Sequence, residues 1–111
     1  MNKAFCSSRD VIIRTDAFAE AVEFYASVLG LRISHRDTNL AGFETGSFCL
    51  YVERGEKHGP VFELLVADVL AAKSSLLAAG CVIVEDNPSV PRCYLRDPYG
   101  LTFNIGLAPN A

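Results

Sequence analysis

Single polar side chains within otherwise apolar segments are the residues of this sequence whose type and position could support chemistry. The stretch from Leu101 to Gly106 alternates strictly, with apolar residues on one side and Thr102, Asn104 and Gly106 on the other. A period of two over this length predicts a half-buried strand. Asn104 lies in the middle of the less apolar side, where its carboxamide could bond to neighbouring strands or meet a ligand or a metal in a cavity. The sequence leaves these interpretations open.

Three charged residues occupy comparable positions in two earlier strand-like segments. Asp10 and Arg14 alternate with apolar residues near positions 10–15, and Glu63 does so near positions 61–66. A charge that leaves water without a partner is costly, so each of them needs a counter-charge or a hydrogen bond. Arg14 and Glu63 could pair with each other, or Arg14 could bind a ligand carboxylate or phosphonate. Asp10 could cap a turn at the rim of a site or contact a ligand.

A nucleophilic site is not indicated, because none of the serines has a histidine at a recognisable spacing. General acid–base chemistry by Glu63 or Asp10 is conceivable on the sequence alone. Tyr94 lies between two arginines, where side-chain packing and proton donation are the two alternatives.

The elements that must position these residues occur twice along the chain. Residues 11–33 and residues 62–84 each predict a strand, a helix, a glycine stop and a second strand. The glycines are Gly30 and Gly80, which suit the left-handed position just after a helix. Asp16 and Asp68 precede the two helices, where N-cap residues are preferred.

Each predicted helix is followed by three short strand candidates, at residues 31–37, 41–45 and 47–53 and again at residues 82–86, 91–97 and 101–106. Turn signals containing proline or glycine separate most of them. The sequence therefore predicts an α+β fold of two tandem βαβββ modules, about residues 8–54 and 60–107, within a single domain of 111 residues. Pairing of the modules would give one curved mixed sheet that forms a cup, with the helices outside.

Strand alternation predicts which side chains face this cup. The expected set is Asp10, Ile12, Arg14, Phe48, Leu50, Val52, Val61, Glu63, Leu65, Thr102 and Asn104. An apolar basin with a few polar groups is typical of sites for small molecules. The candidate ligand-binding residues are Asp10, Arg14, Phe48, Leu50, Val61, Glu63 and Asn104.

Composition restricts the partners. The net charge is −3, with acidic and basic residues interspersed, so no basic surface for nucleic acid is expected. No apolar run approaches the roughly 18 residues that a membrane span needs, and no signal sequence is evident. The four cysteines contain no C-x-x-C pair, and they are expected to stay reduced. We therefore expect no nucleic-acid partner, no membrane partner and a cytoplasmic location.

Two motifs connect the sequence with a known family. Phe24-Tyr25 followed by Val28-Leu29-Gly30-Leu31, and the later Arg96-Asp97-Pro98-Tyr99-Gly100, resemble the vicinal oxygen chelate superfamily over roughly residues 8–107. This superfamily includes glyoxalase I, extradiol dioxygenases, and the fosfomycin and bleomycin resistance proteins. The resemblance implies the fold and a homodimer, whereas the fold alone does not fix an activity.

In metal-dependent members, ligands stand at the start of the first and fifth strands and on the fourth and last strands. The resemblance assigns these places to Asp10, Leu50, Val61 and Asn104. A divalent metal needs about three protein ligands, chiefly histidines and carboxylates, and this set does not supply them. A shifted alignment would bring His58 closer to the place of Val61. The resemblance as aligned implies neither a metal nor another cofactor.

The sequence thus predicts a small-molecule binding protein of the glyoxalase/bleomycin-resistance type, metal-free, that holds a small organic ligand in a sheet-lined cup. The alternative is an enzyme, either a metal-dependent glyoxalase-like lyase or isomerase or a dioxygenase, with a misassigned metal site or with Glu63 as a base. A third class is a protein-interaction module whose cup is filled by its own side chains. For the small-molecule binding protein, a homodimer is expected.

Overall fold

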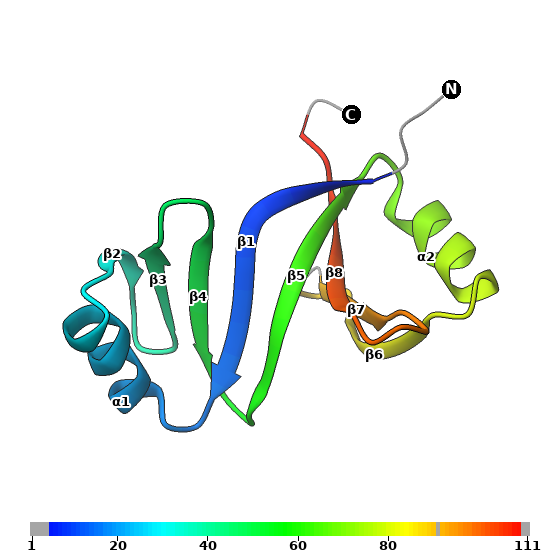
Figure 1. Ribbon diagram of the computed structural model, residues 1–111. Helices are drawn as coiled ribbons and strands as arrows, with labels where there is room; N and C mark the ends of the chain where they lie inside the picture. The colour runs from blue at the N-terminus through cyan, green and yellow to red at the C-terminus, as the bar shows by residue number, and fades with distance from the viewer. Residues whose placement is uncertain (1–4, 91, 110–111) are drawn as a thin grey trace. The chain divides into compact units, whose positions relative to one another are not determined.

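The computed structural model describes residues 5–90 and 92–109, and within it the chain forms two compact units. The first unit spans Arg9–Pro60, and the second contains the residues from Val61 onward together with those that precede Arg9. Each unit carries one βαβββ module, with the elements labelled in Figure 1. The first three residues of β1 and of β5 are grouped with the other unit, and each strand is described below with the unit that holds most of it. The predicted α+β fold of two such modules is confirmed.

The first unit contains a helix and a mixed sheet. Its elements are β1 (Cys6–Thr15), α1 (Phe18–Glu23), a π-helical continuation η1 (Phe24–Val28), β2 (Arg32–Arg36), β3 (Leu40–Glu44) and β4 (Cys49–Arg54). The strands lie in the order β2-β3-β4-β1. Strand β1 runs parallel to β4, and the other neighbours are antiparallel.

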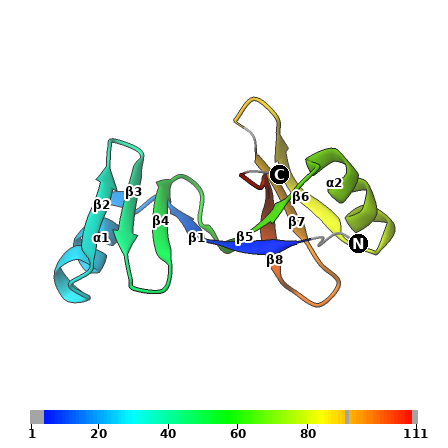
Figure 2. The ribbon, with the colours of Figure 1, turned by 90° about the horizontal axis from the view of Figure 1, so that it is seen from above.

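The second unit repeats this arrangement. Its elements are β5 (His58–Val66), α2 (Val69–Ala78), β6 (Val82–Asn87), β7 (Arg92–Arg96) and β8 (Thr102–Leu107). The order is β5-β8-β7-β6, with β5 parallel to β8 and the remaining pairs antiparallel. Figure 2 shows the same elements from above, with each helix beside the sheet of its own unit.

The two helices begin differently. Asp68 is the N-cap of α2, and its Oδ1 accepts a hydrogen bond from the N–H of Ala71 at 3.0 Å, as predicted. The N-cap of α1 is Ala17, which has no side chain to cap with. Because α1 starts one residue later than the sequence suggested, Asp16 lies outside the cap position, and its predicted N-cap role is wrong. Thr15 instead accepts the Ala17 N–H through Oγ1 at 3.1 Å.

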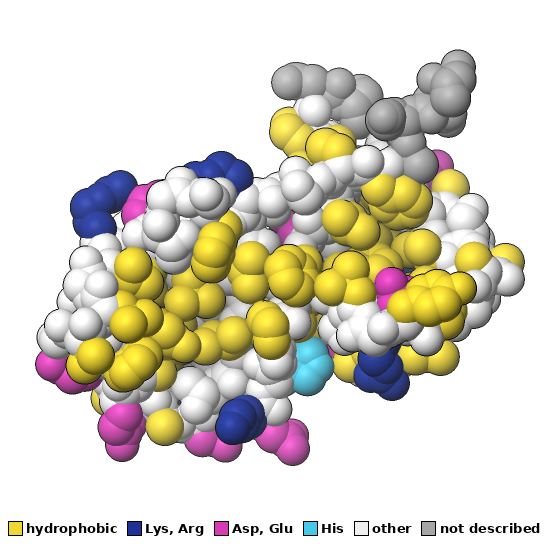
Figure 3. Space-filling view, in the orientation of Figure 1, with side chains coloured by type: hydrophobic (Ala, Val, Ile, Leu, Met, Phe, Trp, Pro, Cys, Tyr) yellow, Lys and Arg dark blue, Asp and Glu magenta, His cyan; other side chains and the backbone are white. Residues whose placement is uncertain are grey.

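Each unit has its own hydrophobic core between helix and sheet. The first core is formed by Phe18, Val22, Ala41, Phe43 and Val52. The second is formed by Cys81, Cys93, Leu95, Phe103 and Ile105. The thiols of Cys81 and Cys93 are free and buried, and they act there as small apolar groups. Figure 3 shows further apolar side chains gathered on the viewer's side of the first unit, over the strands of its sheet.

Strand β4 faces the opposite way from the prediction. Val52 is fully buried in the first core, and Leu50 packs against that core. The register places Leu50 beside Val11 and Val52 beside Ile13, which also packs there. The expected cup-facing orientation of Leu50 and Val52 is therefore wrong. The physical reason is that the run from Phe48 to Val52 is apolar on both faces, so its periodicity does not reveal which face meets the helix.

Candidate functional site

The face of each sheet that is turned away from the helix of its unit is called here the helix-free face. In the first unit, the register of β1 and β4 places on it the neighbours Asp10 and Cys49, then Ile12 and Tyr51, then Arg14 and Glu53. In the second unit, Glu63 lies beside Asn104, and Asn104 lies beside Tyr94. All four candidate polar residues thus lie on a helix-free face beside a residue of the next strand: Asp10 and Arg14 in the first unit, Glu63 and Asn104 in the second.

Arg14 forms an ion pair within the first unit. Its Nε donates to Oε1 of Glu53 at 3.3 Å, and the two side chains are only 18% and 26% exposed. A Cβ atom at Gly55 would lie 2.8 Å from Cδ of Arg14, so the glycine leaves the space in which this side chain lies. Glu53 was not identified from the sequence, because nothing local links residues 39 positions apart.

Asn104 connects the two strands that flank β8. Its Oδ1 accepts the backbone N–H of Cys93 on β7 at 2.9 Å, and its Nδ2 donates to Oε2 of Glu63 on β5 at 3.1 Å. Gly106 leaves room for this carboxylate, since a Cβ there would lie 2.8 Å from the same Oε2. Among the described residues, Asn104 is the only hydrogen-bond donor to Glu63, and none of them donates to its Oε1.

Tyr94 is a packed residue of the second unit. Only 3% of it is exposed, and the Arg92 guanidinium lies 5.2 Å from the centre of its ring. Arg92 also donates from Nη1 to Oε2 of Glu85 at 3.2 Å. Tyr94 therefore forms, with these two neighbours, the side of the helix-free face next to Asn104.

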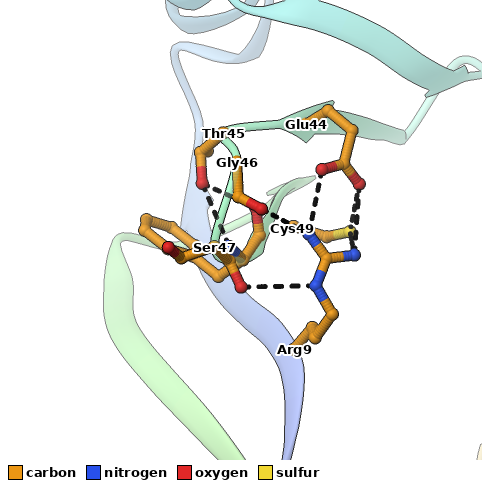
Figure 4. A network of polar contacts seen from close by, with 7 residues as sticks. Arg9, Glu44, Thr45, Gly46, Ser47 and Cys49 are labelled. Carbon is orange, nitrogen blue, oxygen red and sulfur yellow. Dashed lines mark hydrogen bonds and ion pairs between the residues drawn. The ribbon is translucent and has the colours of Figure 1, made fainter.

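A polar cluster around Cys49 was missed in the sequence (Figure 4). Arg9 contacts both carboxylate oxygens of Glu44, at 2.9 and 3.4 Å, and donates to the carbonyl oxygens of Gly46 and Ser47 at 3.1 and 3.3 Å. The Cys49 thiol donates to Oε2 of Glu44 at 2.9 Å. The cluster fastens the β3–β4 turn to β1. No periodicity singles out Arg9 or Glu44, so only the fold brings them together.

The electrostatics of this cluster keep the thiol neutral. Hydrogen bonds from Arg9 and Cys49 lower the pKa of Glu44 from 4.5 to about 2. The hydrogen bond to Glu44, followed by desolvation, raises the pKa of Cys49. Because the thiolate is the reactive form of cysteine, this arrangement opposes a nucleophilic role for Cys49.

The remaining candidates occupy different environments. Val61 is only 2% exposed, and Phe48, just before β4, is 40% exposed. Leu50 belongs to the layer under α1.

The register identifies a better fourth-strand counterpart of Asn104. The two modules can be aligned on the N-cap residues of their helices, Ala17 and Asp68. Ile12 precedes Ala17 by the same number of residues as Glu63 precedes Asp68, so Ile12 and Glu63 are equivalent positions of the duplication. Since Ile12 neighbours Tyr51 and Glu63 neighbours Asn104, Tyr51 is the equivalent of Asn104.

These positions do not fit a divalent metal. The corrected set is Asp10, Tyr51, Val61 and Asn104. Burial, more than nearby acids, raises the pKa of Tyr51, which favours the neutral phenol. Asn104 already uses its carbonyl oxygen for the Cys93 N–H. Across residues 5–90 and 92–109, no three histidine, cysteine, aspartate or glutamate side chains gather where they could hold a metal ion.

Solved structures with the same fold include enzymes. A hypothetical protein from Bacillus halodurans is 13% identical, with a TM-score of 0.69 and 98% of each chain covered. The Mn(II)-bound glyoxalase from Novosphingobium aromaticivorans is 23% identical, with a TM-score of 0.62, and the likeness covers 97% of this chain and 42% of that one. An extradiol ring-cleaving dioxygenase from B. fuscum is 18% identical, with a TM-score of 0.63 and coverages of 94% and 33%.

The chain therefore spans less than half the length of those two enzymes, and at these identities the likeness establishes the fold. No curated protein matches the sequence. In the part of the chain that the structure describes, no helix is both long and apolar enough to cross a membrane.

The family follows from the sequence itself. The sequence model of the glyoxalase-like domain family matches residues 10–106, which is nearly the whole chain. The duplicated βαβββ architecture agrees with this match. The chain belongs to the glyoxalase-like domain family, within the vicinal oxygen chelate superfamily.

Proposed function

We propose that this protein binds a small organic ligand without a metal, as a binding member of the glyoxalase/bleomycin-resistance type. The observation that supports this most strongly is the environment of Asn104. It stands where the resemblance places a metal-binding carboxylate, and both ends of its amide are engaged by Cys93 and Glu63. A neutral amide held in this way adds no charge to attract a cation, but it orients the neighbouring carboxylate.

The helix-free faces offer the chemistry of a ligand site. Glu63 presents a carboxylate oxygen that no described residue uses, on a residue that is half-buried. We propose that this oxygen accepts a hydrogen bond from an N–H or O–H group of the ligand. Asp10, Arg14, Val61 and Phe48 stay proposed contacts, and Tyr51 takes the place of Leu50 in the proposal.

The substitution Glu63→Gln tests this assignment. The probes are small organic compounds found, by thermal-shift screening, to stabilise the purified protein. For those that carry a donor group, the variant is expected to bind about tenfold more weakly, because charge-assisted hydrogen bonds are roughly twice as strong as neutral ones. Calorimetric titration measures the change. Glu56→Gln makes the same substitution at an exposed residue and should leave the affinity unchanged.

The same protein sample separates binding from enzymatic function. The metal-free proposal expects no stoichiometric Mn(II) or Zn(II) in the purified protein, and none taken up on titration. One equivalent of tightly held metal, whose removal abolishes a turnover, would establish the lyase or dioxygenase alternative instead.

We also propose that the chain forms a homodimer. Apolar side chains at the end of the first helix and on β2 support this, with exposures of 46% for Phe24, 69% for Val28, 52% for Leu29 and 41% for Ile33. Patches of this kind on soluble proteins commonly mark interfaces.

Sedimentation equilibrium tests the dimer. The unaltered chain should show twice its mass of 12.0 kDa, and Val28→Glu should shift it toward the monomer because it introduces a charge into the interface. Ala19→Glu adds the same charge at another exposed position of the helix and should leave the mass unchanged. A monomeric unaltered protein would refute the proposal.

A further inference from the structure

A hollow of about 430 Å³ lies within the first unit, where the start of α1 meets the β2–β3 turn and the end of β4. Its lining residues are Phe18, Ala19, Arg36, Asp37, Thr38 and Arg54. Phe18 belongs to the core between α1 and the sheet. The hollow is therefore on the helix side of the sheet, separate from the helix-free face that carries Asp10 and Arg14.

Arg54 is held in place at this hollow. Its guanidinium lies 4.7 Å from the centre of the Phe18 ring. Both Nε and Nη2 donate to the carbonyl oxygen of Thr38, at 3.4 and 3.1 Å. These contacts fix the planar group while its remaining N–H groups stay free for an acceptor. A pre-oriented guanidinium loses less conformational entropy when it binds a carboxylate.

Arg36 supplies a second positive charge. Neither Arg36 nor Arg54 forms an ion pair within the described part of the chain, whereas Arg9, Arg14 and Arg92 each pair with a glutamate. Two guanidinium groups without a salt bridge therefore line one hollow, in a protein whose net charge is −3.

Asp37 also lines the hollow, and its carboxylate is held by neighbouring groups other than the two arginines. Its Oδ1 accepts the N–H groups of Asn39 and Leu40, both at 2.9 Å, and its Oδ2 lies 2.9 Å from Nε2 of His35. These bonds lower the pKa of Asp37, so it stays ionised at the edge of the hollow. One negative charge and two positive ones leave a net positive charge of one in the lining, which favours a ligand with a single negative charge over a dianion.

We propose that this hollow binds a small organic monocarboxylate, at a site distinct from the one in the proposed function. The two guanidinium groups accept the carboxylate through the paired N–H geometry that arginine offers. The organic part of the ligand would contact Ala19, which is exposed, whereas Phe18 is only 3% exposed and carries the Arg54 guanidinium over its ring. The assignment does not depend on whether the helix-free face binds a ligand.

Benzoate and its neutral analogue benzamide test the proposal on the full chain. Titration followed by amide NMR should show saturable benzoate shifts at residues 36–38 and 54, with benzamide at least tenfold weaker. Arg36→Gln should weaken benzoate binding about tenfold, since one charge-assisted contact is lost. The Arg36 side chain is exposed, so the variant is expected to fold.

Arg32→Gln is the matched control, because it removes the same charge from the other end of β2, at a residue that is also exposed and lies outside the hollow. It should change benzoate binding by less than twofold. No saturable benzoate shifts, equal binding of benzamide, or equal losses in the two variants would refute the site. Inorganic phosphate binding more tightly than benzoate would refute the monocarboxylate assignment.

Discussion

Replacing Leu50 by aspartate is expected to lower the free energy of unfolding by about 3 kcal/mol, because Leu50 packs half-buried against the first core and a carboxylate at this position would lose water without gaining a partner. A loss of this size is a large part of the 5–15 kcal/mol that typically stabilises a domain. Urea denaturation followed by circular dichroism measures it.

The control for this change is Leu107→Asp. Leu107 is at the end of β8 and is 65% exposed, so the same substitution should alter the stability by about 0.5 kcal/mol or less. The result also decides the orientation of β4. If Leu50→Asp were as mild as the control and gained affinity for Mn(II), then position 50 would face the ligand cup, as the sequence first suggested.

The parts of the fold that were predicted correctly have local signals. Gly30 and Gly80 end the helices with φ angles of 69° and 104°, which glycine tolerates best. Asp68 caps α2 through its own side chain. The duplication made the glycine signal appear in both modules, and it indicated the order of the elements without any knowledge of their packing.

The sequence-based predictions that failed concern side-chain contacts between segments that are distant in the sequence. The partner of Arg14 is Glu53, which a parallel pairing of β1 and β4 brings beside it. The Arg9–Glu44 pair likewise joins residues 35 positions apart. Sequence periodicity records the two faces of one strand, but it does not record which residue of another strand lies next to it. Candidate site residues could therefore be sorted by face more readily than by partner.

For Asn104, the sequence predicted the face of the strand but not the partners on the neighbouring strands. Its position on the less apolar face was visible in the alternation of residues 101–106. Its partners were not, because Cys93 and Glu63 lie 11 and 41 positions away. The structure shows the interstrand bonding that was one of the alternatives, and it leaves the adjacent carboxylate of Glu63 as the group that a ligand could reach.

Asn104→Asp is expected to destabilise the protein by about 2–3 kcal/mol at pH 7, since it replaces a donor to a carboxylate with a second carboxylate. The new oxygen would stand about where Nδ2 stands now, and the bond from the Cys93 N–H would be kept. Two like charges this close retain a proton more strongly than isolated carboxyl groups do. Above about pH 4, the folded variant would therefore bind more protons than its unfolded chain. Because protons then bind preferentially to the folded state, its free energy of unfolding should rise as the pH falls from 7 to 5. The difference from the unaltered protein, measured by urea denaturation at each pH, should shrink accordingly.

The double variant Glu63→Gln/Asn104→Asp separates charge repulsion from any loss of shape. It moves the amide to β5 and the carboxylate to β8, so that one donor again faces one acceptor across the same pair of strands. It should therefore recover most of the stability at pH 7 and lose the pH dependence of the single variant, which gives a coupling between the two positions of about 2 kcal/mol. A single variant that was equally stable at pH 7 and pH 5 would show that the two side chains are not in contact. A loss of stability alone would not show that the two side chains are in contact, because disturbed pairing of the strands would also lower the stability. Only two facing carboxylates would make the loss of stability smaller at lower pH.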